Sequence, residues 1–369
     1  MYFRRRIGKV AARGDDCDGD NDVCWCSRLE YWGIRHYNSP YWTRVRYDPR
    51  GTNHVTKYRD HLCVIYGTPR YLLGGPGGGT GFGVVLDLTL KLWTLPKLLH
   101  GVVVVPLTDR ESAHKAFETY QSLLRQYPDN LSIFVSLATV PGVGAAMILS
   151  TIWGPPGIQG VSQQVQQEDP GPADPLAALG ESVLDQLTTL PNATVLMRQW
   201  AYYADTIDPN LNTLCPKGAY YHISTQIFSH FTPDVIDMLV DLIVDAPNPH
   251  SVVFIHDFHG PSTRIDPSDP SEGGAWALRT PHLMLEIIGI YNLDGKRTTT
   301  PSHVDRIHAW VRSAVHRLEK AAEGPIADGH INLLSSAERE RVKAFFRETA
   351  ERLNKIRAEL DPERRFREQ

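Results

Sequence analysis

The fold class is decided by the stretch Leu131–Trp153, which reads LSIFVSLATV-PGVG-AAMILSTIW. Leu131–Val140 and Ala145–Trp153 are apolar runs of strand length. The residues between them, Pro141–Gly144, are typical of a tight turn. Because this connection is too short for a crossover helix, the stretch predicts two antiparallel strands joined as a hairpin.

Strand and helix patterns alternate on both sides of this hairpin. Gly101–Leu107 is a buried-strand run, and Thr108 with Glu111 at the capping-box position predicts a helix start after it. Further helices are expected at Pro175–Leu190 and Thr232–Asp245, and further strands at Thr194–Trp200, Ala219–Thr225, Ser251–Asp257 and His282–Tyr291. Helices and antiparallel strands in one segment predict an α+β domain, in which an antiparallel sheet is covered by helices.

The two ends of the chain have different patterns. Residues 1–70 show no sustained period of strand or helix, so no element is predicted there. The glycine-rich Leu73–Gly83 leads into an alternating strand pattern over Leu86–Leu92. Amphipathic helices are predicted over Pro301–Glu323 and Ser335–Leu360.

Composition excludes several classes of protein. The 369 residues are 42% hydrophobic, which allows a large core, and the net charge of -4 argues against a nucleic-acid partner. The longest apolar runs are far shorter than the roughly 20 residues that cross a bilayer. The polar, acidic stretch Gly8–Asp22 is unlike a signal peptide. We expect a soluble protein without a membrane partner, and its location stays open.

No metal site is expected. Cys17, Cys24 and Cys26 with His36 lack the two-residue spacing of paired zinc thiolates. Asp16–Asp22 has acidic residues of the calcium-loop type, but its glycine falls at the wrong position.

Three segments together resemble the berberine bridge enzyme-like flavin oxidoreductases of the vanillyl-alcohol oxidase (PCMH-type) superfamily. Leu73–Val85 and the strand after it look like the glycine-rich turn and strand that close the flavin domain of that family. Val252–Glu286 is similar to a strand, glycine turn, proline-rich loop and second strand of the substrate domain. Gly329–Leu334 with the helix to Arg367 resembles the C-terminal segment of the family.

The resemblance implies a domain organisation and a function. Residues 1–70 stay unassigned, 71–97 would end an FAD-binding domain, 98–325 would form the substrate domain, and 326–369 would return to the FAD domain. Nothing in residues 1–70 resembles the pyrophosphate loop or the flavin-linking residues of the family. The implied activity is hydride transfer from a C–H bond of a small-molecule substrate, such as an alcohol, a sugar or a secondary metabolite, to FAD, with molecular oxygen as electron acceptor.

The resemblance also implies cofactor-binding residues. In the glycine-rich segment a backbone close to a cofactor tolerates no Cβ atom. In the C-terminal segment an amide or an imidazole could bond the flavin or the substrate, although a turn-capping asparagine and a solvent-facing histidine are the alternatives. The candidates are Gly79, Gly81, Phe82, Gly83, Val84, His330 and Asn332.

The candidate catalytic residues lie on two predicted strands. Glu286 is a lone carboxylate in an apolar strand, on one side with Met284 and Ile288, and burial against a flavin would raise its pKa and suit it to accept a substrate proton. The alternative is a strand-edge glutamate paired with an arginine. Tyr291, on the opposite side of that strand, and His256, on the neighbouring strand, are further candidates, against the alternatives of a packing aromatic and a core histidine.

A function of another class also stays open. A chain without a complete flavin domain could be an inactive, truncated remnant of such an oxidase that acts at most as an interaction domain. Bound flavin would distinguish the enzyme from the remnant.

Overall fold

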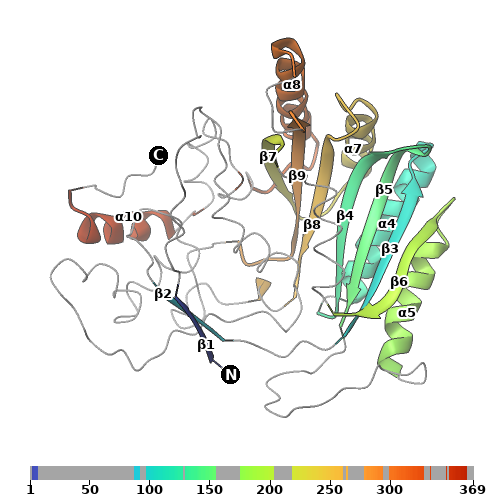
Figure 1. Cartoon of the computed structure of the whole chain (residues 1–369), viewed down its shortest axis with the longest axis horizontal. Helices are drawn as coiled ribbons and strands as arrows, with labels where there is room; N and C mark the ends of the chain where they lie inside the picture. Colours follow the sequence, from blue (N-terminus) through green and yellow to red (C-terminus); the bar gives the residue numbers. More distant parts are fainter. Residues whose placement is uncertain are drawn as a thin grey trace.

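The computed structural model describes residues 2–6, 87–91, 97–127, 129–154, 175–202, 218–260, 263–264, 278–293, 299–327, 333, 346 and 349–363 (Figure 1). At 2–6 and 87–91 the description concerns the backbone.

A seven-stranded sheet forms the centre of the described chain, with every neighbouring pair of strands antiparallel. The strand order is β6-β3-β5-β4-β8-β9-β7. The strands are β3 (Leu98–Pro106), β4 (Leu131–Val140), β5 (Gly144–Trp153), β6 (Thr194–Ala201), β7 (Tyr220–Phe228), β8 (Val252–Phe258) and β9 (His282–Tyr291).

The predicted hairpin is confirmed as β4 and β5. They pair in register from Leu131 opposite Trp153 to Val140 opposite Gly144. The turn uses positive backbone angles, with φ of 78° at Gly142 and 91° at Gly144, which glycine adopts without steric cost. The hairpin lies inside the sheet, where it is flanked by β3 and β8.

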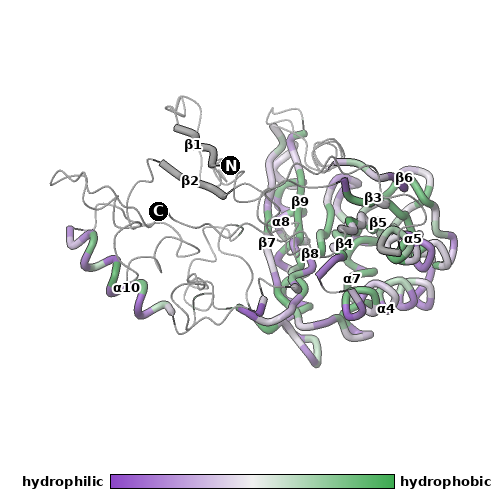
Figure 2. The backbone as a smooth tube through the Cα atoms, turned by 90° about the horizontal axis from the view of Figure 1, so that it is seen from below, coloured by the Kyte–Doolittle hydropathy of each residue, from purple (hydrophilic) through white to green (hydrophobic). Residues whose placement is uncertain are grey.

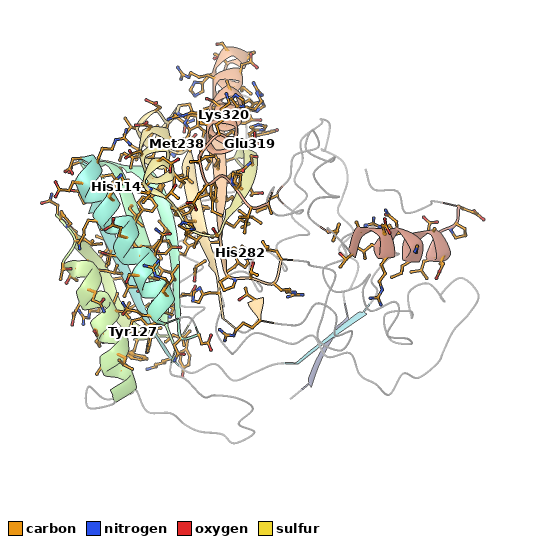
Figure 3. All side chains as sticks on the ribbon, turned by 180° about the vertical axis from the view of Figure 1, so that it is seen from behind. His114, Tyr127, Met238, His282, Glu319 and Lys320 are labelled. Atoms are coloured by element: carbon orange, nitrogen blue, oxygen red, sulfur yellow. The ribbon has the colours of Figure 1, made fainter. Side chains whose placement is uncertain are left out.

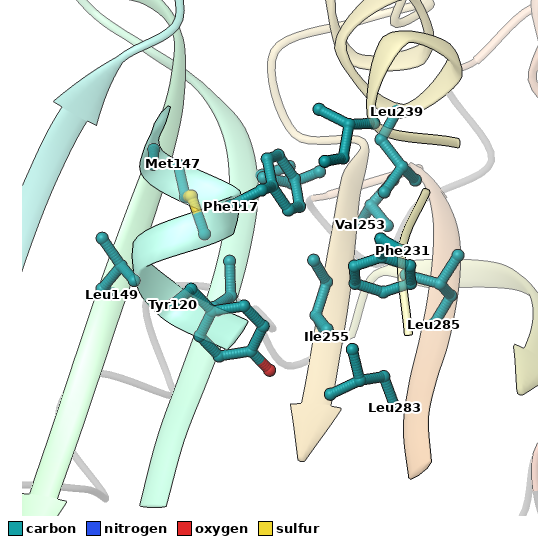
Figure 4. Packing of buried hydrophobic residues seen from close by; sticks show 14 of the residues in the cluster. Phe117, Tyr120, Met147, Leu149, Phe231, Leu239, Val253, Ile255, Leu283 and Leu285 are labelled. Atoms are coloured by element: carbon teal, nitrogen blue, oxygen red, sulfur yellow. The ribbon is translucent and has the colours of Figure 1, made fainter. Parts of the chain in front are cut away.

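Four helices cover one face of this sheet (Figures 1 and 2). They are α4 (Arg110–Gln126), α5 (Pro175–Thr188), α7 (Pro233–Val244) and α8 (Pro301–Leu318). Their apolar sides form one core with alternate residues of the strands. Figure 4 shows Phe117 and Tyr120 of α4 packed between Met147 on one side and Ile255 on the other. The expected α+β fold, an antiparallel sheet covered by helices, is confirmed.

Two helix boundaries differ from those expected. Helix α4 is capped by Asp109 rather than Thr108, because the Asp109 side chain accepts a hydrogen bond from the Ser112 backbone N–H. Helix α8 ends at Leu318, before the expected Glu323.

The opposite face of the sheet, called the second face below, carries the other alternate residues of the strands. Among the described residues two apolar clusters line it, and their members outside the strands are Ala219, Leu278, Ala327 and Leu333. Ala327 also bridges to Ile227 of β7 through backbone hydrogen bonds.

The N-terminal residues supply a strand that the sequence did not predict. Strand β1 (Tyr2–Arg6) pairs antiparallel with β2 (Asp87–Lys91), which lies within the predicted Leu86–Leu92 strand. Helix α10 (Thr349–Leu360) lies within the predicted C-terminal helix.

Candidate functional site

Strand alternation places Glu286 on the second face. In β9, Leu283, Leu285 and Ile287 belong to the helix-covered core, so the residues between them point the other way. Met284 and Ile288, on the same side as Glu286, belong to the clusters of the second face. The division of this strand into two faces, predicted from the sequence, is confirmed.

Glu286 is paired with His256. The His256 Nε2 atom lies 2.8 Å from Glu286 Oε2, and the side chains are 4% and 0% exposed. The contact is an ion pair when the imidazole is protonated and a neutral hydrogen bond when the carboxyl group holds the proton. In both cases one proton lies between an acid and a base that are screened from water.

The strand order corrects one part of the alternative for Glu286, its location on a sheet edge. Strand β9 lies between β8 and β7, so Glu286 is not on a sheet edge. A group at hydrogen-bond distance from Glu286 is the imidazole of His256. An interior position is more costly for a carboxylate than an edge, which explains why a close partner is needed.

Aromatic rings surround the imidazole. The ring centroids of Phe134 and His256 are 5.1 Å apart, and those of Phe254 and His256 are 6.4 Å apart. Phe134 and Phe254 also contact each other, at 5.0 Å. The pair therefore lies in an apolar environment with a low dielectric constant. Hydrogen bonds and charges interact more strongly there than in water.

A row of residues crosses the second face at the level of Glu286. Phe254 of β8 and Thr225 of β7 lie directly opposite Glu286 on either side. Ser136 of β4 lies opposite Phe254. Sequence reasoning missed Ser136, Phe254 and Thr225, because only the register of four strands brings them beside Glu286. The available signal was a serine in the apolar run of β4.

Tyr291 is not brought to this pair. It lies on the helix-covered side, where its hydroxyl group is 3.4 Å from His308 Nε2 of α8 and its ring stacks on Tyr220 at 5.7 Å. Burial, and next the neighbouring Tyr220, raise the pKa of the Tyr291 phenol. A raised pKa makes this phenol a weaker general acid and keeps it neutral.

His259, the residue after β8, has a structural environment. Its Nδ1 atom lies 3.0 Å from Asp257 Oδ2, and its Nε2 atom lies 2.9 Å from the Leu131 carbonyl oxygen. Both ring nitrogens are thus engaged at the ends of β8 and β4.

His282 begins β9 at the end nearest the pair, and Figure 3 labels it there. Its ring stacks on Phe258 at 4.7 Å, and its Nδ1 atom is 2.7 Å from the Thr280 carbonyl oxygen. Burial lowers the pKa of His282 to about 4, so this imidazole is neutral near neutral pH.

The expected cofactor-binding residues lie outside the described residues. They are Gly79, Gly81, Phe82, Gly83, Val84, His330 and Asn332. The residue that follows Asn332 is described: Leu333 is 3% exposed and belongs to the same apolar cluster of the second face as Met284 and Phe258. The C-terminal segment therefore reaches the face that carries Glu286.

Within the described ranges, no group of three or more His, Cys, Asp or Glu side chains could hold a metal ion. The Asp16–Asp22 and Cys17–Cys26 segments lie outside those ranges. No helix in the described part of the chain is long and apolar enough to span a bilayer.

Comparison of whole chains finds similar folds among solved structures. GilR, an oxidoreductase that catalyses the terminal step of gilvocarcin biosynthesis, superposes with a TM-score of 0.61 at 14% identity, over 80% of this chain and 63% of its own. A glucooligosaccharide oxidase from Acremonium strictum, whose structure revealed a novel flavinylation, gives 0.56 at 15% identity, over 80% and 60%. A variant of berberine bridge enzyme gives 0.56 at 14% identity, over 82% and 60%.

These structural neighbours are berberine bridge enzyme-like oxidoreductases, and the expected resemblance is confirmed at the level of the fold. The chain spans about three fifths of the length of these neighbours. No protein-family model matches the chain, and no curated protein sequence matches it.

Proposed function

We propose that this chain is the substrate-domain part of a berberine bridge enzyme-like, FAD-dependent oxidoreductase that oxidises a small molecule at a C–H bond. The shared fold is the starting point, and the buried Glu286–His256 pair carries the proposal. An acid held at hydrogen-bond distance from an imidazole, inside an apolar face, is suited to accept a proton from a substrate.

The chain's own residues would manage the proton. With an alcohol as substrate, the hydroxyl proton would pass to the Glu286 carboxylate. The carbon that bears the hydroxyl group would lose a hydride to the flavin, and its C–O bond would become a carbonyl. His256 holds the carboxylate in one orientation and offers a second base for the proton. The apolar neighbours Phe134 and Phe254 keep water from the reacting atoms.

Bound FAD would supply the acceptor for the hydride. The second face fits a flat ring and a substrate, because it offers aromatic and aliphatic contact around the buried acid Glu286. Leu333 supports a contribution of the C-terminal segment, and we propose the following cofactor contacts: Gly79, Gly81, Phe82, Gly83, Val84, His330 and Asn332. Molecular oxygen is the proposed final electron acceptor.

The proposed division of labour keeps the expected boundaries. Residues 71–97 and 326–369 would contribute to the flavin side and residues 98–325 to the substrate side. The described β3–β9 sheet lies within the second of these units.

The test of this function is the substitution Glu286→Gln. Glutamine keeps the size and a hydrogen bond to His256 but cannot accept the proton, so we expect turnover to fall by about 10²–10⁴-fold. Substrate-dependent oxygen consumption over a panel of alcohols, sugars and phenolic alcohols measures it. Glu118→Gln, the same change at an exposed position of α4, is the matched control and should keep full activity.

Two outcomes would contradict the proposal. Equal turnover of Glu286→Gln and the unchanged chain would exclude Glu286 as the base. A folded chain that holds no flavin would instead support the inactive remnant.

A further inference from the structure

The part of the second face beside Glu286 is strongly apolar. Its cluster is open on one side, because half of its members are only partly buried. The buried members are Ala138, Val252, Phe254, Ile288 and Ile290, and the partly buried members are Phe134, Ile148, Ala219, Tyr221 and Ile223. A sugar chain placed on this surface would leave several of its hydroxyl groups without partners, which is costly.

A buried polar side chain, Ser136, lies within this surface. Ser136 is 1% exposed, and its hydroxyl group has no hydrogen-bond partner among the described residues. An unbonded buried hydroxyl costs free energy, and it is common where a ligand supplies the missing partner. Alternation in β4 directs Ser136 to the second face, because Val135 and Leu137 belong to the helix-covered core.

The register fixes how far Ser136 lies from the acid. Ser136, Phe254 and Glu286 occupy one row on the adjacent strands β4, β8 and β9. Neighbouring strands are about 4.8 Å apart, so the Cα atoms of Ser136 and Glu286 are separated by about 10 Å. A fused ring system covers this span, whereas a small aliphatic alcohol does not.

We propose that the substrate of this face is a planar polycyclic aromatic alcohol with an oxygen substituent that bonds to Ser136. Its rings lie along Phe254 and Phe134, and its reacting carbinol lies at Glu286. Ser136 thus determines specificity and takes no part in the proton transfer. The identity of the reacting end rests on the function proposed above, but the binding of the rings and of the substituent does not.

Binding to the full chain is tested without turnover. The probes are alizarin, a planar polycyclic phenol; anthraquinone, which has the same rings without hydroxyl groups; and cellotetraose, an oligosaccharide. Quenching of tryptophan fluorescence measures the binding of the two aromatic probes, and titration calorimetry measures the binding of cellotetraose. We expect alizarin to bind more tightly than anthraquinone and cellotetraose not to bind.

Two variants test whether the Ser136 hydroxyl group binds the substituent of the probe. Ser136→Ala should weaken the binding of alizarin by about threefold to tenfold, because one neutral hydrogen bond is lost. The binding of anthraquinone should not change. The melting temperature of Ser136→Ala should not fall, since the hydroxyl has no structural bond to lose. Ser150→Ala, on the same face of β5 but outside the row, is the matched control and should bind alizarin normally.

Several results would overturn the inference. These are tight binding of cellotetraose without binding of alizarin, equal affinity of Ser136→Ala for alizarin, or a lower melting temperature of Ser136→Ala. Failure of the function is a separate result: a flavin-free chain that binds alizarin through Ser136 keeps this inference and contradicts only the oxidation. Turnover of sugars that depends on Glu286 would support the proposed oxidation and contradict this inference.

Discussion

Replacing His256 by leucine separates the two members of the buried pair and keeps an apolar side chain of similar size. In the unchanged chain His256 Nε2 and Glu286 Oε2 are 2.8 Å apart, and Glu286 is 0% exposed. The substitution removes this contact from the carboxyl group while the carboxyl group stays inside the sheet. The change therefore removes the imidazole and leaves the carboxyl group buried.

The expected loss of stability is large. Removal of one partner of a buried pair costs about 3–5 kcal/mol, because the remaining group stays desolvated. Replacement of both members by leucine removes the desolvation penalty together with the contact, so the double variant should lie within about 2 kcal/mol of the unchanged chain.

Urea denaturation followed by tryptophan fluorescence measures these values at neutral pH. The three variants are His256→Leu, Glu286→Leu and the double variant. A cost of His256→Leu below about 1 kcal/mol, of the size of an exposed pair, would refute the reasoning. Additive costs of the two single changes would also refute it, because a coupled pair is not additive.

Two further predictions concern the packing and the pH dependence of the sheet. A Cβ atom at Gly289 would lie 2.3 Å from Ile307 Cγ2 of α8, so Gly289→Ala should cost about 1–3 kcal/mol and lower the melting temperature; an unchanged melting temperature would show that α8 moves aside freely. Burial lowers the pKa of His282 from 6.5 to about 4, so the unfolded chain takes up this proton first as the pH falls, and stability is lost between those values by up to about 1.4 kcal/mol per pH unit and is unaffected above them. His282→Gln should flatten this part of the stability curve, and an equally steep curve would contradict the assignment.

Much of the fold was predictable from the sequence. The hairpin was recognisable because two apolar runs flank a glycine-containing turn, and β9 was predicted with its observed bounds, His282–Tyr291. The two faces of β9 followed from simple alternation. Helix ends were less predictable, because Thr108 and Asp109 are both good caps and only the hydrogen bond to Ser112 decides between them.

The pairing of distant segments was not predictable. Tyr2–Arg6 pairs with Asp87–Lys91 across most of the N-terminal region, and no local pattern encodes such a partner. The candidate site shows the same limit. Glu286 was recognisable as a lone carboxylate among apolar residues, but its partner His256 and its neighbour Ser136 depend on the order of strands in the sheet. Tyr291 was also a candidate catalytic residue, and it lies on the opposite side of β9, as the alternation predicted.

The most direct test of the central claim is the visible absorption spectrum of the purified full chain, recorded before and after acid precipitation. We expect the two absorption bands of oxidised flavin in the native sample, and we expect them to bleach when substrate is added without oxygen. Bands that stay with the precipitated protein would indicate a covalent link, and bands released into solution would indicate a bound but unlinked flavin. A folded, colourless chain that takes up no added FAD would contradict the claim that this chain is part of a flavin-dependent oxidoreductase.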